Sequence, residues 1–220
     1  SRAGWAPCGR AGCSTSSPAC RRRPSCPCLG LILRADGGAT QRAPARSAPR
    51  LLFGAEDGLR LAADAVAVMG FVGQPEESAS LANLAALAGQ CAPWGLPVLA
   101  EMLLVGAGGR PPTGDDVAFA ARVVAELGAD LVKVPYAGPG PAFRQAVAAC
   151  PCPLVVLGGE RAPDAAALLA TIAQAMDAGA SGVAIGRNVW QHAHPEGMMR
   201  ALVALVHGGA TVEGAARELD

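Results

Sequence analysis

The chain contains one lysine, Lys133, in the segment DLVKVPY, and the other 17 of its 18 Lys and Arg residues are arginines. Lys133 lies in an apolar run between Val132 and Val134, a pattern typical of a buried strand. An amine that loses its hydration there can act as a nucleophile and form a Schiff base with a carbonyl compound. The alternative is a lysine that reaches the strand end and pairs with a carboxylate. These residues alone leave both interpretations open.

Two glycine-containing segments, LGG and IGRN, end the last two apolar runs of the chain. In parallel barrels, the loops after the last two strands often bind phosphate through backbone N–H groups and a short helix. Gly158, Gly159 and Gly186 would let the backbone approach a phosphate closely. Arg187 would add a charge-assisted contact. Glycines are also common in turns, so it is the pair of segments that predicts a phosphate site.

Three further side chains near the ends of apolar runs are candidates for the same site. Tyr136 comes three residues after Lys133 and could transfer a proton or simply pack at the mouth of a barrel. Glu101, in VLAE, and Asp36, in RADGG, are carboxylates at expected strand ends, where most carboxylates are structural or solvated. We expect Tyr136 and Glu101 to act in catalysis and Asp36 to contribute to substrate binding.

The histidines do not indicate a metal site. His192 and His194 lie in HAHP without a nearby cysteine or carboxylate cluster, whereas zinc needs several such ligands at defined spacings. His194 followed by Pro195 is instead typical of a helix cap and first turn. Met198 and Met199 are predicted to be core residues contributed by that helix.

The first 28 residues differ in composition from the rest of the chain. They are rich in Cys, Arg, Pro, Ser and Gly and have no hydrophobic period, so we expect a disordered leader or sequence foreign to the fold. The basic segment RRR at 21–23 is not followed by the long apolar h-region of a signal peptide, so we expect a cytoplasmic location by default. The segment 41–50 is expected to be a loop. Five of the eight cysteines lie in this first segment at spacings that match no paired zinc motif: Cys8, Cys13, Cys20, Cys26 and Cys28.

From residue 29 onward, short apolar runs alternate with helical stretches. The expected strands lie within the apolar runs 29–38, 64–73, 96–103, 130–138, 153–159 and 181–188. The expected helices span 55–63, 76–92, 114–127, 141–149, 164–178 and 195–206. Gly128 and Gly179 suit the left-handed positions that end two of these helices. This alternation predicts an α/β fold with a parallel sheet.

The composition limits the classes of partner. The chain is 51% hydrophobic and 16% charged, with a formal net charge of zero, so it can bury a large core and has no electrostatic signature of nucleic acid or membrane binding. We expect a phosphorylated small molecule as the partner.

Between the two common parallel folds, the sequence favours a (β/α)8 TIM barrel. No GxGxxG follows the first apolar run, which disfavours a dinucleotide-binding sheet. Candidate residues at the ends of several different strands are typical of a barrel. Six βα units are visible in residues 29–220, so we expect a partial barrel that lacks its first two units.

The segments LGADLVKVPYAG, PLVVLGGER and AMDAGASGVAIGRNVWQHAHPEGMMRALVALVHGG resemble archaeal-type class I fructose-bisphosphate aldolases. They are also similar to deoxyribose-phosphate aldolase-like proteins and to the autoinducer-2 phosphate thiolase/aldolase. The resemblance covers about residues 29–220. It implies a (β/α)8 barrel and rings of five or ten subunits. It also implies that Lys133 is the Schiff-base lysine and that Gly158, Gly159, Gly186 and Arg187 form the phosphate-binding loops.

The sequence departs from that family in two places. It has no DHG motif, which in the family places a catalytic Asp on the first strand. Leu103 stands where the fructose-bisphosphate enzymes carry the Tyr of YPRG. The autoinducer relatives lack that tyrosine as well. Chemistry on some phosphorylated carbonyl compound is therefore better indicated than cleavage of a hexose bisphosphate.

The main hypothesis is a class I aldolase that needs no metal and no organic cofactor, because the iminium formed on Lys133 serves as the electron sink. The alternatives are a related acyl or aldol transferase that uses the same lysine, and an inactive truncated barrel with open sheet edges.

Overall fold

The computed structural model describes residues 30–37, 49–138, 140–159, 162 and 164–219. The expected leader at 1–28, with its five cysteines, and most of the loop expected at 41–50 lie outside the described residues.

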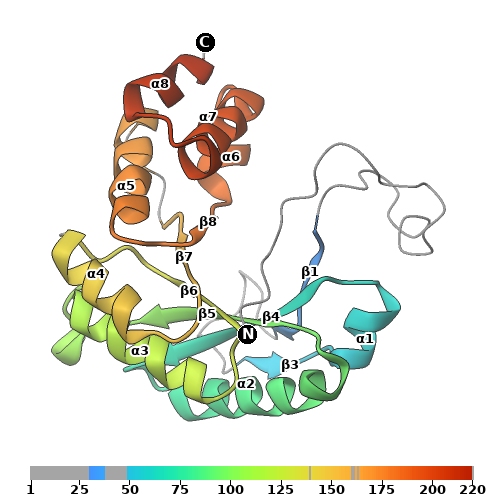
Figure 1. Cartoon of the computed structure of the whole chain (residues 1–220). Coiled ribbons are helices and arrows are strands. Elements are labelled where there is room, and N and C mark those ends of the chain that lie inside the picture. The colour runs from blue at the N-terminus through green and yellow to red at the C-terminus, as the bar shows by residue number, and fades with distance from the viewer. Residues whose placement is uncertain (1–29, 38–48, 139, 160–161, 163, 220) are drawn as a thin grey trace.

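Six parallel strands form one sheet, in the order β1-β4-β5-β6-β7-β8 (Figure 1). Each overlaps one of the apolar runs in which a strand was predicted. The strands are β1 (Ile32–Arg34), β4 (Ala65–Val72), β5 (Val98–Leu104), β6 (Leu131–Val134), β7 (Leu154–Leu157) and β8 (Gly182–Ala184). A short antiparallel pair, β2 (Asp36–Gly37) with β3 (Arg50–Leu51), was not predicted.

The six predicted helices are present and alternate with the strands, which confirms the parallel α/β architecture. They are α1 (Ala55–Arg60), α2 (Glu77–Cys91), α3 (Gly114–Glu126), α4 (Gly140–Ala149), α5 (Ala165–Asp177) and α7 (Pro195–Gly208). Shorter helices that were not predicted are α6 (Arg187–Trp190), α8 (Val212–Ala216), η2 (Ala92–Trp94), η3 (Ala107–Gly109) and η4 (Arg217–Leu219). In Figure 1, α2 and α3 lie beneath β4 and β5, whereas α5 to α8 gather beyond β7 and β8.

The two faces of the sheet differ in burial. On β5, Ala100 and Met102 are completely buried against the helix layer, whereas Glu101 between them is only partly buried. On β6, Val132 and Val134 are completely buried and Lys133 is not. Successive strand residues point to opposite faces, so Glu101 and Lys133 share the face that forms a barrel interior. The sheet is therefore a partial TIM barrel with six strands among the described residues, where a closed barrel has eight.

Repeated aspartates fix the start of neighbouring strands. The carboxylate of Asp64 accepts a hydrogen bond from the backbone N–H of Leu31 at 2.6 Å, just before β1. The carboxylate of Asp130 accepts one from the N–H of Val98 at 2.9 Å, at the start of β5. Each aspartate precedes the next strand in the sheet, so it links two parallel strands at their amino ends.

The predicted helix ends and the predicted burial of two methionines can be compared with the structure. Gly128 and Gly179 both have φ of 100°, which confirms the predicted left-handed positions after α3 and α5. His194 is the N-cap residue of α7 and Pro195 begins the helix, but the imidazole makes no capping hydrogen bond. Met198 is buried as predicted, whereas Met199 is 49% exposed, so its predicted place in the core is wrong.

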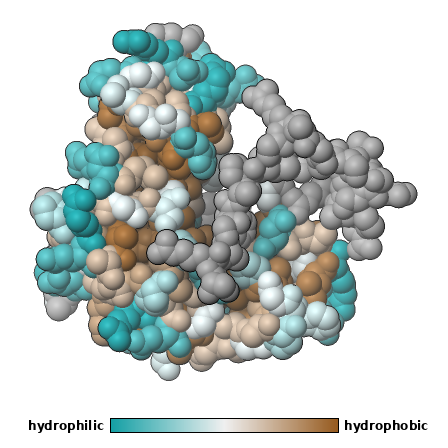
Figure 2. All heavy atoms as spheres, in the orientation of Figure 1, coloured by the Kyte–Doolittle hydropathy of each residue, from teal (hydrophilic) through white to brown (hydrophobic). Residues whose placement is uncertain are grey.

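Large apolar side chains remain exposed near both ends of the sheet. Leu31 and Ile32 are exposed at β1, and Trp190, Met199 and Val203 are exposed beyond β8. Figure 2 shows hydrophobic surface in the region of α5 to α8 and again near α1. No helix in the described part of the chain is long and apolar enough to cross a membrane.

Candidate active site

Lys133 lies in the centre of the inner face of the sheet. In the register of the parallel strands, it is the partner of Glu101 on β5 and of Val155 on β7. Paired residues of adjacent strands point to the same face, so the two charged side chains meet. The Nζ atom of Lys133 lies 2.7 Å from Oε1 of Glu101, and both side chains are about one-fifth exposed, at 19% and 18%. The carboxylate pairing that the sequence left open is therefore present, on the inner face of the sheet.

Arg34 extends this pair into a chain of charges. Its Nη1 atom lies 2.7 Å from Oε2 of Glu101, and its Nε lies 2.5 Å from Oδ1 of Asp36. The other oxygen of Asp36, Oδ2, accepts a hydrogen bond from the backbone N–H of Met69 at 2.9 Å. The sequence analysis did not single out Arg34. Its position two residues before Asp36, at strand spacing, was the available signal, because residues i and i+2 share a face.

Glu101 is held as a carboxylate. Burial by itself would raise the pKa of this carboxyl, but hydrogen bonds from Lys133 and Arg34, and their positive charges, outweigh that effect. The pKa of Glu101 consequently lies below its ordinary value. A carboxyl in this state can accept a proton or balance a positive charge, and it is a poor proton donor near neutral pH.

Asp36 lies just past the end of β1, at a strand end as predicted. Its side chain is completely buried, and its two oxygens are taken by Arg34 and by the backbone of β4. Because both oxygens already have partners within the protein, a direct contact with substrate stays a prediction. In the structure, Asp36 holds Arg34.

Tyr136 packs in the helix layer rather than beside Lys133. Its ring centroid lies 5.0 Å from that of Phe143, a fully buried residue of α4. Its hydroxyl donates a long hydrogen bond of 3.4 Å to Oε1 of Gln174, on α5. Among the described residues it has no hydrogen bond to Lys133 or Glu101. The packing role that the sequence left open is thus favoured over the catalytic one.

The predicted glycine segments lie side by side. Arg187 donates from Nη2 to the carbonyl of Gly159 at 3.1 Å. Asn188 donates from Nδ2 to the carbonyl of Gly158 at 2.8 Å, and its Oδ1 accepts from the N–H of Ala162 at 2.9 Å. The loops after β7 and β8 are thereby joined into one surface, as a shared phosphate site requires. Asn188 was not among the predicted site residues, although it directly follows Arg187.

Close contacts explain two of these glycines. A Cβ on Gly158 would come within 2.8 Å of Cγ2 of Ile185. A Cβ on Gly186 would come within 2.3 Å of the ring of Trp190. A side chain at Gly158 would push the two loops apart, and one at Gly186 would displace the Trp190 ring within the segment after β8. Gly159 has φ of 61°, a left-handed conformation that other residues rarely adopt.

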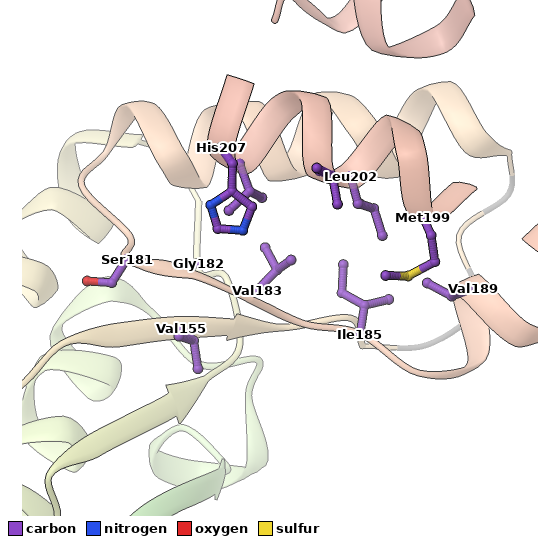
Figure 3. Close-up of a pocket in the computed structure, with 11 residues that line it drawn as sticks. Val155, Ser181, Gly182, Val183, Ile185, Val189, Met199, Leu202 and His207 are labelled. Carbon is purple, nitrogen blue, oxygen red and sulfur yellow. The ribbon is translucent and has the colours of Figure 1, made fainter. Parts of the chain in front are cut away.

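Two pockets lie near the glycine segments. One, of about 210 Å³, is lined by Arg187, Asn188 and His192 together with residues of α5. The other, of about 270 Å³, lies between α7 and β8 (Figure 3). There Leu202, Met199 and His207 extend from α7 toward Val183 and Ile185. Neither pocket is lined by Lys133 or Glu101. No group of three His, Cys, Asp or Glu side chains within the described ranges could hold a metal ion.

A partial barrel with a lysine on its inner face, and with joined glycine loops at the carboxyl ends of its last strands, is typical of TIM-barrel enzymes. Residues 19–192 match the model of the DeoC/LacD family aldolases, and the chain belongs to that family. The resemblance noted from the sequence is confirmed at this level.

Two curated relatives are named for phosphorylated carbonyl compounds. The chain is 41% identical to 2-amino-4,5-dihydroxy-6-oxo-7-(phosphonooxy)heptanoate synthase of Streptomyces griseus, over 81% of this chain and 65% of the relative. It is 36% identical to 3-hydroxy-5-phosphonooxypentane-2,4-dione thiolase of Escherichia coli, over 84% of this chain and 62% of the relative. The chain thus spans less than two-thirds of the length of these relatives.

Solved structures confirm the barrel. An archaeal fructose 1,6-bisphosphate aldolase matches with a TM-score of 0.76 and 30% identity, over 83% of this chain and 73% of the other. An archaeal fructose-1,6-bisphosphate aldolase with its catalytic lysine covalently bound to the carbinolamine intermediate matches with a TM-score of 0.75. That match has 29% identity and covers 81% of this chain and 72% of the other.

Proposed function

We propose that this protein is a class I aldolase that forms a Schiff base between Lys133 and a phosphorylated carbonyl substrate. The observation that carries the proposal is the position of the only lysine of the chain, on the inner face of β6 against Glu101. Membership in the DeoC/LacD aldolase family supports it.

Glu101 suits the charge changes of this reaction. The Lys133 ammonium first gives up one proton, and the neutral amine attacks the carbonyl carbon. The carbonyl oxygen then leaves as water with that proton and a second hydrogen from the nitrogen, so a positively charged iminium replaces the ammonium. The ion pair with Glu101 is thereby preserved, which stabilises the iminium without reorganisation of the site. The C–C bond then breaks, and its electron pair moves to the iminium to give a neutral enamine and an aldehyde. The proton released from the cleaved alcohol needs an acceptor, and the Glu101 carboxylate is in the correct state to take it.

The phosphate is proposed to bind at the joined loops of Gly158, Gly159, Gly186 and Arg187. Backbone groups of these loops lie at the carboxyl ends of β7 and β8, on the same edge of the sheet as the end of β6. Binding there would direct the substrate carbonyl toward Lys133.

The experiment is chemical trapping. The protein is incubated with dihydroxyacetone phosphate, reduced with borohydride, and analysed by intact mass and peptide mapping. We expect one stable adduct, on the peptide that contains Lys133. The variant Lys133→Arg keeps the positive charge and cannot form an imine, so it serves as the matched control. Absence of an adduct from folded wild-type protein would contradict the proposal for this substrate.

Phosphate recognition is tested by comparison with dihydroxyacetone. Trapping of the phosphorylated compound should be faster, and Arg187→Gln should bring the two rates together. Equal rates in the wild type would contradict a phosphate site at these loops.

A related transferase is the second candidate, favoured by the thiolase relative and by Leu103 in place of a tyrosine acid. Both candidates predict the same adduct, and a panel of phosphorylated ketones with added acceptors separates them. Assembly into rings of five or ten subunits remains a prediction, to be measured by light scattering.

A further inference from the structure

We propose that Arg34 is a positioning residue that clamps the Glu101 carboxylate so that its Oε1 atom faces Lys133. The catalytic meaning of this clamp rests on the proposed Schiff-base function, whereas the clamp itself can be tested without substrate.

The arginine reaches its partner across an intervening strand. Arg34 is on β1 and Glu101 is on β5, and β4 lies between them in the sheet. The guanidinium uses two different nitrogens, Nε toward Asp36 and Nη1 toward Glu101. Because the guanidinium is planar and rigid, fixing one nitrogen also fixes the direction of the other. The buried Asp36 therefore determines where Arg34 places its second contact.

Glu101 is in turn fixed from both sides. Oε2 binds Arg34 and Oε1 binds Lys133, each at 2.7 Å, so neither oxygen can rotate away without breaking a charge-assisted hydrogen bond. The charged groups that face Glu101 in the described part of the chain are Arg34 from β1 and Lys133 from β6, with Asp36 behind Arg34.

The clamp matters because the number of N–H donors on the Lys133 nitrogen changes during the proposed reaction. An ammonium has three N–H donors and can pair with a carboxylate in many orientations. The iminium that replaces it has one N–H, held in the plane of the C=N bond. A single donor of fixed direction needs an acceptor that is already in place, and the clamp supplies that acceptor. A lysine in place of Arg34 could not bridge both carboxylates in the same geometry.

The single lysine allows a direct measurement. Protein labelled with ¹³Cε-lysine shows one lysine side-chain signal, and titration to low pH should show an inflection when Glu101 takes up a proton. Removal of Arg34 removes one of the two cations that lower the pKa of Glu101. The inflection is therefore expected to move to higher pH in Arg34→Gln. Arg122→Gln, which removes an exposed ion pair with Glu126 on α3, is the matched control and should leave the inflection unchanged.

The second measurement is the rate of borohydride trapping with dihydroxyacetone phosphate. Arg34→Gln should slow trapping about tenfold, as expected when a charge-assisted hydrogen bond that orients a reacting group is lost. Arg34→Lys should restore the positive charge and only part of the rate. Because Arg34→Gln leaves the buried Asp36 carboxylate without its positively charged partner, the double variant Arg34→Gln/Asp36→Asn is included to keep the sheet stable. It should show the same rate loss and the same shifted inflection.

The outcomes separate the two proposals. An unchanged inflection in folded Arg34→Gln or in the double variant would overturn the clamp. If wild-type protein forms an adduct and the Arg34 variants form it equally fast, the clamp has no positioning role. If wild-type protein forms no adduct, the proposed function fails, and the lysine signal still decides whether Arg34 holds Glu101 as a carboxylate.

Discussion

Replacement of Glu101 by glutamine tests the electrostatic account of the site most directly. The variant Glu101→Gln keeps the shape of the side chain but leaves Lys133 and Arg34 as two neighbouring cations on the inner face of the sheet. A charge-assisted hydrogen bond contributes roughly 1.5–3 kcal/mol, and the contact with Arg34 is weakened by solvent because that side chain is 40% exposed. We therefore expect the free energy of unfolding to fall by about 2–3 kcal/mol at pH 7.

The pH dependence of this loss has a defined sign. The pKa of Glu101 is lowered in the folded protein from an ordinary value of 4.5. The stabilisation is consequently complete above pH 4.5 and is lost only as the pH falls through the folded-state pKa. The difference between wild type and Glu101→Gln should stay constant from pH 7 to pH 5 and shrink below about 4.5.

Urea denaturation at a series of pH values measures both quantities. Glu126→Gln, which breaks an exposed ion pair with Arg122, is the control and should change stability by less than about 0.5 kcal/mol. The reasoning is refuted if Glu101→Gln is as stable as wild type at pH 7. It is refuted equally by a stability difference that does not shrink in acid.

Three further substitutions test the loops and the tyrosine. Asn188→Ala removes the hydrogen bonds to Gly158 and Ala162 and should lower the free energy of unfolding by about 1–3 kcal/mol. It should also weaken the preference for phosphorylated ketones, which is measured by comparing trapping rates. Gly158→Ala places a methyl group 2.8 Å from Ile185 and should cost about 1–3 kcal/mol by urea denaturation, so an unchanged midpoint would count against the close contact. Tyr136→Phe loses only a long hydrogen bond to Gln174 and should change the trapping rate less than about twofold, whereas a much larger loss would restore the catalytic role.

The order of strands and helices could be predicted from local patterns. Apolar runs ended by small residues became β4 to β8, and Ala- and Leu-rich stretches became the helices between them. The short elements were missed, because α6 and β2 contain too few residues to show a period. The exposed Met199 was missed for another reason. Two adjacent helix residues point about 100° apart, so Met198 and Met199 cannot both face the same core.

The sequence by itself indicated that Lys133 lies in a buried strand, because Val132 and Val134 flank it in an apolar run, but the face of the sheet was decided by the structure, in which both valines are buried and Lys133 is not. The sequence also determined which loops carry the glycines and Arg187. Only the tertiary structure decided the neighbours of each side chain. Glu101 meets Lys133 because β5 and β6 pair in that register, and Arg34 reaches Glu101 across β4. Such pairings join residues 32 and 67 positions apart, and a local pattern holds no information on the register between strands. For the same reason, the sequence could not show that Asp36 is buried behind Arg34.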